Sequence, residues 1–362
     1  MKIASISENQ DIEKRIAITP EIAKKYISSG FNISLPKNYG VHIGFGDEEY
    51  SNLGINLLDN EEELIKDSEI IIQLGLPNED KLLLLKENQT LIGSLNAFSN
   101  KEKLENLKSK KINCFSLELL PRITRAQSMD ILSSQANLAG YKAVIEAFQV
   151  YERAIPMMMT AAGTIPAAKV LVIGAGVAGL QAIATAKRMG AVVFATDVRM
   201  ASKEQVESLG GKFLTVEGSE NLETEGGYAK EASEDFKIKQ EELLTETLKK
   251  IDIIICTALI PGREAPKIIK KEMFKNLQSG SVIYDLAATQ GGNTVFTEVD
   301  KIIEKNGVKI LGDANILNKL PVSASNLYSK NVFNFISNLY DKENKKLNIN
   351  LEDEIIEKTL IK

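Results

Sequence analysis

Short apolar runs alternate with amphipathic stretches along most of the chain, and this alternation predicts strands separated by helices. In the first third of the chain, the runs of strand length are residues 3–6, 31–36, 69–74, 89–95 and 111–117. The third run is almost continuously apolar, which is typical of a strand buried on both faces of a parallel sheet. Thr19 and Pro20 suit the start of a helix and Gly30 its end. The pattern predicts an α/β domain.

A longer helical pattern follows, from about residue 133 to residue 155. Val144, Phe148 and Tyr151 fall on one face of this helix, and Pro156 is expected to end it, because the residue before a proline avoids helical backbone. We expect a rigid bridge between two α/β halves.

A second alternation of strands and helices begins at Lys169. Its strands are expected at residues 169–174, 191–197, 251–259, 280–287 and 308–313. A helix is expected from Leu180 to Met189, and helical stretches separate most of the strands. This order is typical of a doubly wound sheet.

Two segments depart from the pattern. Residues 216–250 are acidic, contain glycine and have few large apolar side chains, so we expect a mobile loop followed by an exposed helix. The charged tail after Tyr340 is expected to end in a short helix or to fray.

A glycine motif stands between the strand that starts at Lys169 and the helix that follows it. Gly174, Gly176 and Gly179 form a G-x-G-x-x-G element. In such an element the first glycine permits a tight turn, the second lets the backbone approach a pyrophosphate, and the third lets helix and strand pack closely. The start of the helix offers N–H groups to phosphates. The motif predicts a dinucleotide site; the alternative is a turn that binds nothing.

Asp197 stands at the end of the next predicted strand. A carboxylate there can accept hydrogen bonds from both hydroxyls of an adenosine ribose and would repel a 2′-phosphate, so we expect NAD(H) rather than NADP(H). Arg199 favours NADP(H) instead, because an arginine near the ribose can bind a 2′-phosphate. Asp197 has the greater weight because it occupies the expected strand end.

Two further segments are candidates for contacts with nicotinamide. Leu259 follows a strand whose carboxyl end would face the ligand crevice, although a plain strand-to-loop exit explains it equally well. Residues 122–133 are dense in hydrogen-bonding side chains, and a carboxamide needs both donors and acceptors. These can come from Arg122, Gln127, Asp130 and Ser133. The residues alone favour a simpler interpretation, a capped helix start with solvated charges.

Composition narrows the possible functions. The chain has 362 residues and a net charge of −5, which suits two domains and gives no basic field for nucleic acid. Cys114 and Cys256 lack metal-type spacing, which favours a reducing, cytosolic compartment. We expect no signal peptide and no membrane helix. His42 is the only histidine, and its glycine-rich surroundings favour a surface position over general acid–base catalysis.

Several long motifs resemble the NAD(H)-binding component, domain I, of proton-translocating NAD(P)+ transhydrogenases, in the alanine dehydrogenase/transhydrogenase superfamily. The motifs are residues 121–144, 156–199, 203–213, 226–231, 257–262, 281–287 and 291–293. The resemblance runs from about residue 3 to residue 340. It implies an α/β fold of two Rossmann-like parallel-sheet domains linked by long helices, with NAD(H) in the cleft between them, and a homodimer.

The resemblance also implies domain limits and contacts. The domains are expected to be residues 1–131 with 318–362, and residues 132–317, the latter with a mobile loop at about 217–240 that closes over the nucleotide. The family's nicotinamide-contacting positions match Arg122, Gln127, Asp130 and Ser133, and we add Ile123 and Thr124 as cofactor contacts. Its nucleotide-contacting positions match Val177, Asp197, Val198, Arg199, Gly227, Gln240 and Leu259. Tyr228 is expected to belong to the closing loop.

The activity implied is direct hydride transfer between NADH and NADP+ on a separate NADP(H)-binding subunit, coupled to proton movement through a membrane-spanning subunit. The chain would then be cytoplasmic and peripheral on the inner face of the cytoplasmic membrane. Transfer between two nicotinamides needs aligned C4 atoms and excluded water rather than a general acid or base. A chain with a single histidine suits that chemistry.

Two other functions stay open. An alanine dehydrogenase-like amino-acid oxidoreductase has the same architecture, and Arg15 fits both families. It would need a lysine near residues 70–77 and a histidine in residues 93–98, and the chain has neither there. It would also need an acidic residue near Gln290, where the chain has Thr289. The other alternative is a non-catalytic NAD(H)-sensing module.

Overall fold

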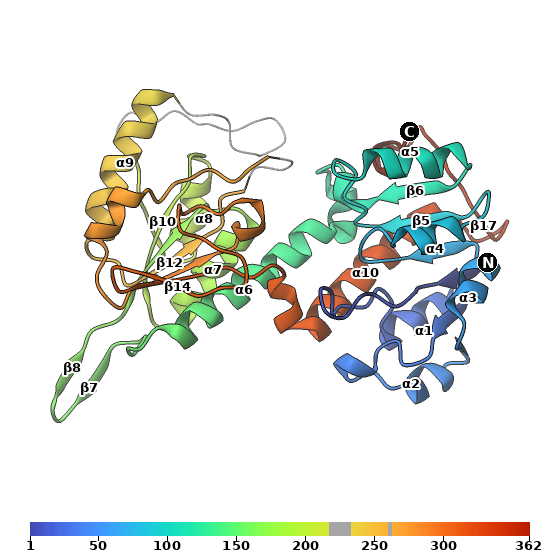
Figure 1. The fold of residues 1–362 in the computed structure, drawn as a ribbon, viewed down its shortest axis with the longest axis horizontal. Helices are drawn as coiled ribbons and strands as arrows, with labels where there is room; N and C mark the ends of the chain where they lie inside the picture. Colours follow the sequence, from blue (N-terminus) through green and yellow to red (C-terminus); the bar gives the residue numbers. More distant parts are fainter. Residues whose placement is uncertain (217–232, 260–262) are drawn as a thin grey trace. The chain divides into compact units, whose positions relative to one another are not determined.

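The structure is a computed structural model that describes residues 1–216, 233–259 and 263–362 (Figure 1). The predicted loop residues Gly227 and Tyr228 lie outside these ranges. The chain divides into two compact units, residues 1–135 with 317–362, and residues 136–316. Helix α6 (Ile131–Val150) begins in the first unit and continues into the second.

The first unit contains a fully parallel sheet in the order β3-β2-β1-β4-β5-β6. Its strands are β1 (Lys2–Ala4), β2 (Asn32–Pro36), β3 (Asn56–Leu58), β4 (Ile70–Ile72), β5 (Thr90–Gly93) and β6 (Asn113–Ser116). Every apolar run predicted for this region is confirmed as a strand. The pattern misses β3, an edge strand whose leucines are only half-buried.

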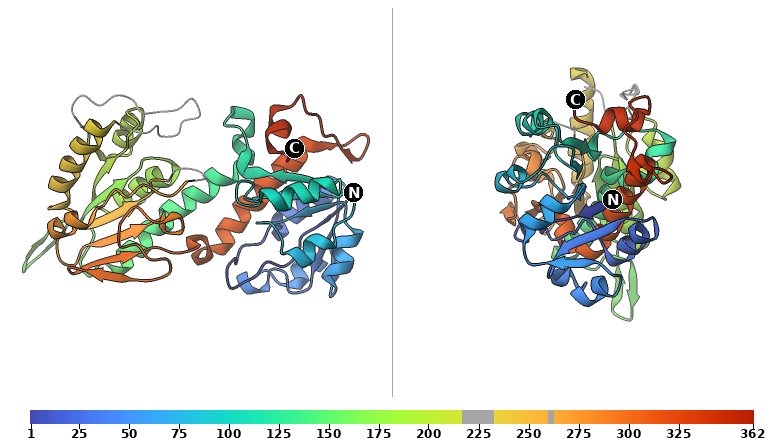
Figure 2. Two further views of the ribbon diagram at one scale, coloured as in Figure 1. Left: turned by 45° about the horizontal axis from the view of Figure 1, so that its top comes forward. Right: turned by 90° about the vertical axis from the view of Figure 1, so that its right-hand side faces the viewer.

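The sheet of the first unit is covered by helices on both faces, because neighbouring side chains along a strand point to opposite sides. Ile70 and Ile72 pack with α1 (Pro20–Ser28) and α10 (Pro321–Leu339). Ile71 points the other way, and its layer of the core is completed by α3 (Glu61–Asp67), α4 (Glu79–Leu83) and α5 (Lys101–Ser109). Since α10 comes from the end of the chain, this unit is discontinuous in sequence and holds both termini (Figure 2).

The charged tail joins the same core. Its last helix, α11 (Glu354–Thr359), buries Ile355 and Ile356, and Asp353 caps it by accepting a hydrogen bond from the Ile355 N–H. Of the two outcomes expected for the tail, a short helix or a frayed end, the structure shows the helix. The rest of the unit includes α2 (Asp47–Ser51) and the pair β16 (Tyr340–Asp341) and β17 (Lys346–Leu347).

The second unit contains a sheet in the order β11-β10-β9-β12-β13-β15-β14, parallel except for β14. Its strands are β9 (Lys169–Ile173), β10 (Val192–Thr196), β11 (Lys212–Phe213), β12 (Ile253–Cys256), β13 (Val282–Asp285), β14 (Ile303–Lys305) and β15 (Val308–Leu311). The predicted doubly wound sheet is confirmed. The first helix, α7 (Val177–Arg188), begins at Val177 rather than Leu180, because Gly176 is its N-cap.

Three expectations for the second unit are corrected. Helix α6 ends at Val150 rather than at residue 155, and the chain then forms a hairpin of β7 (Met158–Thr160) and β8 (Gly163–Ile165) that projects from the unit (Figure 2). The helix predicted after the acidic loop is α9 (Glu234–Leu248), so the loop limit at about residue 240 falls inside it. One side of α9 is buried through Leu244 and Leu248, because it covers the sheet. The second unit also contains α8 (Ser202–Ser208).

Candidate nucleotide site

The connection from β9 to α7, residues 174–176, is built for close approach of another backbone or a ligand. Gly174 has a φ of +94°, a left-handed conformation that side chains disfavour. A Cβ on Gly179 would lie 1.8 Å from the Gly174 carbonyl oxygen. At Gly176 the nearest atom to such a Cβ is Nη2 of Arg199, at 3.9 Å. The three glycines therefore have the environments that a phosphate-binding turn requires.

The start of α7 is held from two sides. A Cβ on Gly140 of α6 would lie 2.0 Å from the Ala178 carbonyl oxygen, so α6 packs directly on the first turn of α7. Thr257, just after β12, donates from Oγ1 to the Gly174 carbonyl at 2.8 Å. The N-cap Gly176 has no side chain to bond the first-turn N–H groups. The first turn of α7 therefore lacks a side-chain cap, as at helix N-termini that bind anions.

Asp197 directly follows β10 and reaches back to the glycine turn. Its Oδ2 accepts a hydrogen bond from the Ala175 N–H at 2.6 Å. Arg199 binds the same carboxylate, from its N–H and Nε to Oδ1 at 2.8 and 2.9 Å and from Nη2 to Oδ2 at 2.7 Å. The two side chains are 6% and 18% exposed, for Asp197 and Arg199 respectively. The acidic group at the strand end is thus present but already paired.

A narrow pocket beside Asp197 brings several predicted positions together. It is lined by Thr196, Asp197, Val198, Met200, Phe213, Leu214, Thr215, Val216 and Gln240. Gln240 comes from α9, so the helix that follows the acidic segment contributes to the same pocket as the end of β10. Val177 and Leu259 lie on other parts of this unit, at the start of α7 and after β12, with 40% and 42% of their surfaces exposed.

Asn293 fixes the backbone just before Leu259. Its side chain accepts from the Ala258 N–H at 3.1 Å and donates to the Ala258 carbonyl at 2.8 Å and the Pro266 carbonyl at 3.0 Å. The Asn293 N–H in turn donates to the buried Asp285 at 2.7 Å. Sequence reasoning gave Asn293 no role, and its position at the end of the motif of residues 291–293 was the signal available.

The polar segment 122–133 belongs to the first unit, where Thr124–Met129 form a 3₁₀ helix ahead of α6. Ala126 and Met129 are buried, while Arg122, Thr124 and Gln127 are exposed and Ile123 is half-buried. Asp130 accepts hydrogen bonds from the N–H and Oγ of Ser133, at 2.9 and 2.6 Å. Asp130 therefore caps α6, as the simpler interpretation predicted.

Helix α10 and the tail hold this segment in place. Asn331 and Asn334 both donate to the Ser128 carbonyl, at 2.8 and 2.9 Å. Arg125 pairs with Asp353, and hydrogen bonds from the guanidinium lower the pKa of that carboxyl to about 2. Sequence reasoning missed these supports because the partners lie more than two hundred positions away along the chain.

The carboxyl ends of β1 and β4 in the first unit carry a second polar cluster, whose members bind one another. Glu8 accepts from Gln73 Nε2 and from the Leu74 N–H, both at 3.0 Å. Burial raises the pKa of Glu8 to about 7. Nearby, Arg15 binds Glu13 through two nitrogens, at 2.8 and 2.6 Å, and Gln135 at 2.8 Å.

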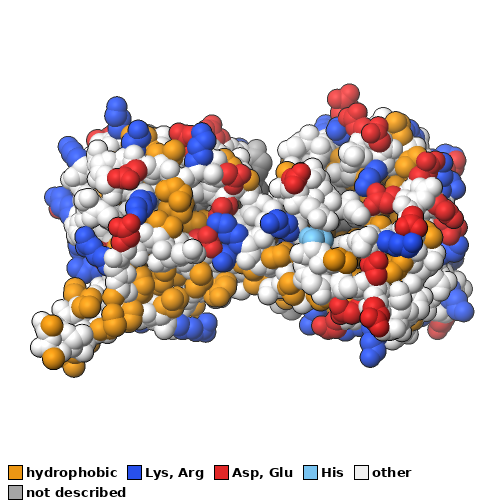
Figure 3. Space-filling view, turned by 60° about the horizontal axis from the view of Figure 1, so that its bottom comes forward, with side chains coloured by type: hydrophobic (Ala, Val, Ile, Leu, Met, Phe, Trp, Pro, Cys, Tyr) orange, Lys and Arg blue, Asp and Glu red, His pale blue; other side chains and the backbone are white. Residues whose placement is uncertain are grey.

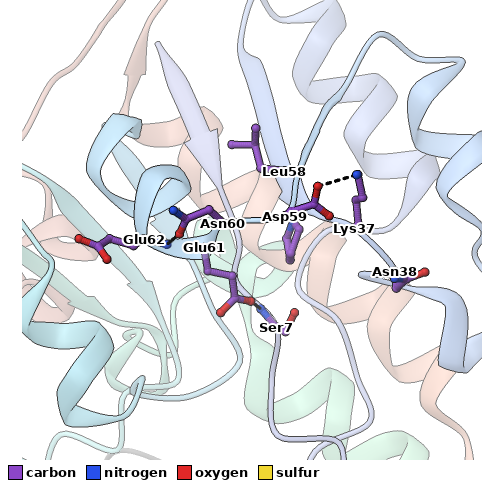
Figure 4. Close-up of a pocket in the computed structure, with 9 residues that line it drawn as sticks. Ser7, Lys37, Asn38, Leu58, Asp59, Asn60, Glu61 and Glu62 are labelled. Atoms are coloured by element: carbon purple, nitrogen blue, oxygen red, sulfur yellow. Dashed lines mark hydrogen bonds and ion pairs between the residues drawn. The ribbon is translucent and has the colours of Figure 1, made fainter.

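Charged side chains that line a groove at the ends of β1, β2 and β3 also bind other residues of the same groove (Figure 4). Lys37 binds Asp59 at 2.6 Å, and the Ser7 N–H donates to Glu61 at 2.8 Å. His42 lies elsewhere on the surface of this unit, with Nε2 2.8 Å from the Lys14 carbonyl, as predicted for a surface histidine.

A parallel sheet of this order, a glycine turn entering a helix and an acidic side chain after the neighbouring strand define a dinucleotide-binding domain of the Rossmann type. Comparison with known families agrees. The chain matches the alanine dehydrogenase/PNT N-terminal domain over residues 5–139 and the C-terminal domain of the same family over residues 143–362.

The chain belongs to the alanine dehydrogenase/PNT family, on the branch formed by the first portion of NAD(P) transhydrogenase subunit alpha. It is 48% identical to that protein of Rhodospirillum rubrum, over 100% of this chain and 96% of the relative. It is 44% identical to that of Rickettsia prowazekii, over 100% and 94%. The crystal structure of transhydrogenase from Sinorhizobium meliloti superimposes with a TM-score of 0.88, at 41% identity, covering 99% of this chain and 98% of the other.

An L-alanine dehydrogenase structure shares the fold, with a TM-score of 0.81 at 21% identity and coverage of 99% and 94%. Among the described helices, none combines the length and apolar character needed to cross a membrane.

Proposed function

We propose that the second unit binds NAD(H) and that the chain presents the nicotinamide for direct hydride exchange with NADP(H) on a partner subunit. A membrane-spanning subunit would couple this exchange to proton translocation, and the chain would lie on the cytoplasmic face of the membrane through its partners. The domains would be residues 1–131 with 318–362, and residues 132–317. The bound dihydronicotinamide supplies the hydride; the chain binds it, orients it and excludes water.

The observation that carries the proposal is the geometry of the β9–α7 turn. Gly174 and Gly179 are required there for steric reasons, the N-terminus of α7 has no side-chain cap, and Asp197 lies at the end of β10. A pyrophosphate would bind the N–H groups of the turn, and the adenosine ribose would bind Asp197. Val177, Val198, Gln240 and Leu259 would form the walls of the site, with Gly227 and Tyr228 as further contacts.

Arg122, Gln127, Asp130 and Ser133 would orient the nicotinamide ring, with Ile123 and Thr124 beside them. Gln127 is exposed, and an amide side chain matches a carboxamide because each has a donor and an acceptor. Asp130 and Ser133 are joined by two hydrogen bonds, so we expect them to act as one unit that fixes the start of α6.

The test is single-turnover hydride transfer in a complex reconstituted with the NADP-binding subunit. Gln127→Ala should slow the transfer by about tenfold to a hundredfold, because a lost hydrogen bond misaligns the ring. The matched control is Ser128→Ala, the next residue, whose backbone carbonyl rather than side chain holds the segment. Equal transfer rates in the two variants would refute the role of Gln127.

An amino-acid dehydrogenase is the second candidate, because curated relatives include alanine dehydrogenases at 28% and 26% identity. The first unit argues against it. Gln73 is 1% exposed and bonded to Ser5, Ile6 and Glu8, and Arg15 is bound by Glu13 and Gln135. Neither side chain is placed to take up a substrate carboxylate without breaking these bonds. NADH formation from L-alanine and NAD+ by the purified chain would support this candidate instead.

A homodimer is supported by the β7–β8 hairpin. Met157, Met158, Met159 and Ile165 are exposed on it, and residues 154–168 contain no charged side chain. Figure 3 shows hydrophobic side chains gathered on this projecting arm. A two-stranded hairpin is marginally stable alone in water, so an uncharged, exposed hairpin needs a surface to cover it. We propose that a second copy of the chain provides it.

Met159→Glu tests the dimer, because Met159 is 80% exposed and would place a charge in the interface. Its control is Leu83→Glu, at a position 69% exposed in the first unit. Sedimentation equilibrium should show a dimer for the control and a loss of at least tenfold in dimer affinity for Met159→Glu. A dimer of unchanged affinity would exclude the hairpin as its interface.

A further inference from the structure

The 3₁₀ helix Thr124–Met129 has three faces with different surroundings. Residues three positions apart lie on the same face of such a helix, because it has three residues per turn. Ala126 and Met129 form a buried face, which belongs to the apolar core of the first unit. Thr124 and Gln127 form a second face, and both side chains are exposed. The face proposed to meet the nicotinamide therefore lies beside a face that is fixed by packing.

The third face carries Arg125, whose guanidinium is bound by residues from the end of the chain. Asp353 in the tail accepts from Nη1 at 2.9 Å with one carboxylate oxygen and from Nη2 with the other. This side-by-side arrangement fixes the plane of a guanidinium. Asn338 of α10 closes the group, because its Oδ1 accepts from Nη1 at 3.3 Å and its Nδ2 donates to Asp353 at 3.1 Å. Two separate elements thus hold one side chain of the 3₁₀ helix.

Asp353 is itself a fixed partner. It caps α11 by accepting from the Ile355 N–H at 3.0 Å, and its side chain is 15% exposed. Ile355 and Ile356 anchor α11 in the same apolar core that holds Ala126 and Met129. An ion pair between two mobile surface side chains restrains little. Here one partner is anchored by the fold, so the pair restrains the other.

Helix α10 also holds the backbone of the segment. Asn331, Asn334 and Asn338 stand at positions i, i+3 and i+7, so they lie on one face of α10. The first two donate to the Ser128 carbonyl at 2.8 and 2.9 Å. The bound carbonyl comes one position after Gln127, and the bound guanidinium comes two positions before it. The 3₁₀ helix cannot turn about its own axis without breaking these bonds.

We propose that Arg125 and Asp353 are positioning residues for hydride transfer: their ion pair fixes the rotation of the 3₁₀ helix and thereby the direction of the Gln127 side chain. The proposal rests on the role of Gln127 proposed above and adds the tail to the parts of the chain that orient the nicotinamide. Transfer between two rings depends steeply on geometry, since a displacement of about 1 Å can cost about a hundredfold in rate.

The experiment measures single-turnover hydride transfer in the complex reconstituted with the NADP-binding subunit, and NADH affinity by fluorescence titration. The variants are Arg125→Gln and Asp353→Asn; the second removes the charge but keeps a side chain that can cap α11. Each should slow the transfer about fivefold to twentyfold. The dissociation constant of NADH should change by less than about twofold, because a hydrogen bond to one end of the ligand is a small part of its binding.

The matched control is Lys25→Gln, which breaks an exposed ion pair on α1 of the same unit. It should leave both the transfer rate and the NADH affinity at the values of the wild type. Hydrogen exchange tests the restraint directly: the amide protons of residues 124–130 should exchange faster in Arg125→Gln and Asp353→Asn than in Lys25→Gln. If circular dichroism shows that Asp353→Asn is unfolded, Asp353→Ser replaces it, because serine also caps helices.

A double variant shows whether Arg125 acts through Gln127. Arg125→Gln combined with Gln127→Ala should transfer hydride no more slowly than Gln127→Ala alone, because a restraint on a missing side chain has no effect. If the two losses multiplied, Arg125 would influence the reaction by another route and the proposal would be overturned. A lower stability of Arg125→Gln with an unchanged transfer rate would also overturn it, since the ion pair would then be purely structural.

The two proposals fail in different ways. If Gln127→Ala transfers hydride as fast as the wild type, the role of Gln127 is wrong and the positioning proposal falls with it. If Gln127→Ala is slow while folded Arg125→Gln and Asp353→Asn transfer at the rate of the wild type, only the positioning proposal is overturned.

Discussion

The sheets of the two units share the order of their first five strands but differ in how the first strand leads to the first helix. In each sheet the first strand is central, and the second and third strands lie on one side of it. In the second unit β9 passes to α7 through residues 174–176, a glycine turn. In the first unit β1 passes to α1 through residues 5–19, which contain no glycine. The topology that permits nucleotide binding is present twice, and the turn that permits it is present once.

The residue after the second strand differs as well. It is Asp197 after β10 and Lys37 after β2. Asp197 reaches the glycine turn, whereas Lys37 pairs with Asp59 at the surface. In the first unit the carboxyl ends of β1 and β4 are occupied by the chain's own Glu8 and Gln73. In such sheets the crevice lies where the strand order reverses. It can hold a ligand only where the chain's own side chains and connecting backbone do not occupy it.

The largest effect is expected from closing the glycine turn. Gly179→Ala would put a Cβ 1.8 Å from the Gly174 carbonyl oxygen, so the helix must move away from the turn. We expect NADH affinity to fall about a hundredfold and the free energy of unfolding to fall by about 1–3 kcal/mol. The comparison is Gly46→Ala in the first unit, where nothing lies within 4 Å of the new Cβ. Fluorescence titration measures the NADH affinity, and urea unfolding measures the free energy of unfolding. If Gly179→Ala and Gly46→Ala gave the same values, the packing of α7 on the turn would not require a glycine at position 179.

An intermediate effect is expected from the titration of Glu8, which lies at the carboxyl ends of β1 and β4 in the first unit. Burial raises the pKa of Glu8 from 4.5 to about 7, so the folded chain favours the protonated carboxyl. The stability contributed by this group is complete below about pH 4.5 and is lost as the pH rises through about 7, by at most about 3 kcal/mol. Glu8→Gln removes the titration.

Urea unfolding between pH 5 and pH 8 tests this expectation. The free energy of unfolding of Glu8→Gln, relative to the wild type, should increase with pH over that range. The control is Glu21→Gln, which removes an exposed carboxylate of the same unit. If the difference for Glu8→Gln stayed as flat as that for Glu21→Gln, the carboxyl would not be perturbed by folding.

The smallest effect is expected at the surface counterpart of Asp197. Lys37 is 50% exposed in its pair with Asp59, and such pairs contribute less than about 1 kcal/mol. Lys37→Ala should therefore leave the affinity for NADH within twofold of the wild type, whereas Asp197→Ala should weaken it at least tenfold. A loss of NADH binding in Lys37→Ala would show that the groove of the first unit takes part in nucleotide binding.

Local signals determined most of the architecture. Apolar runs identified β1, β2, β4, β5 and β6, because a strand buried on both faces leaves few polar positions. Caps and glycines gave the ends of α1, and the glycine spacing located the turn before α7. The edge strand β3 and the hairpin of β7 and β8 were missed, because each of these strands has only three residues and none of those residues is buried.

The sequence by itself determined that a glycine turn and an acidic strand end occur in the right order, since these depend on neighbours along the chain. Only the tertiary structure decided that Asp197 is bound by Arg199, that Asn331 and Asn334 hold Ser128, and that the crevice of the first unit is filled. Most of these hydrogen bonds join residues that lie on different elements. The bond between Asp197 and Arg199 instead requires one particular orientation of each side chain. Packing, not spacing along the chain, selects among them.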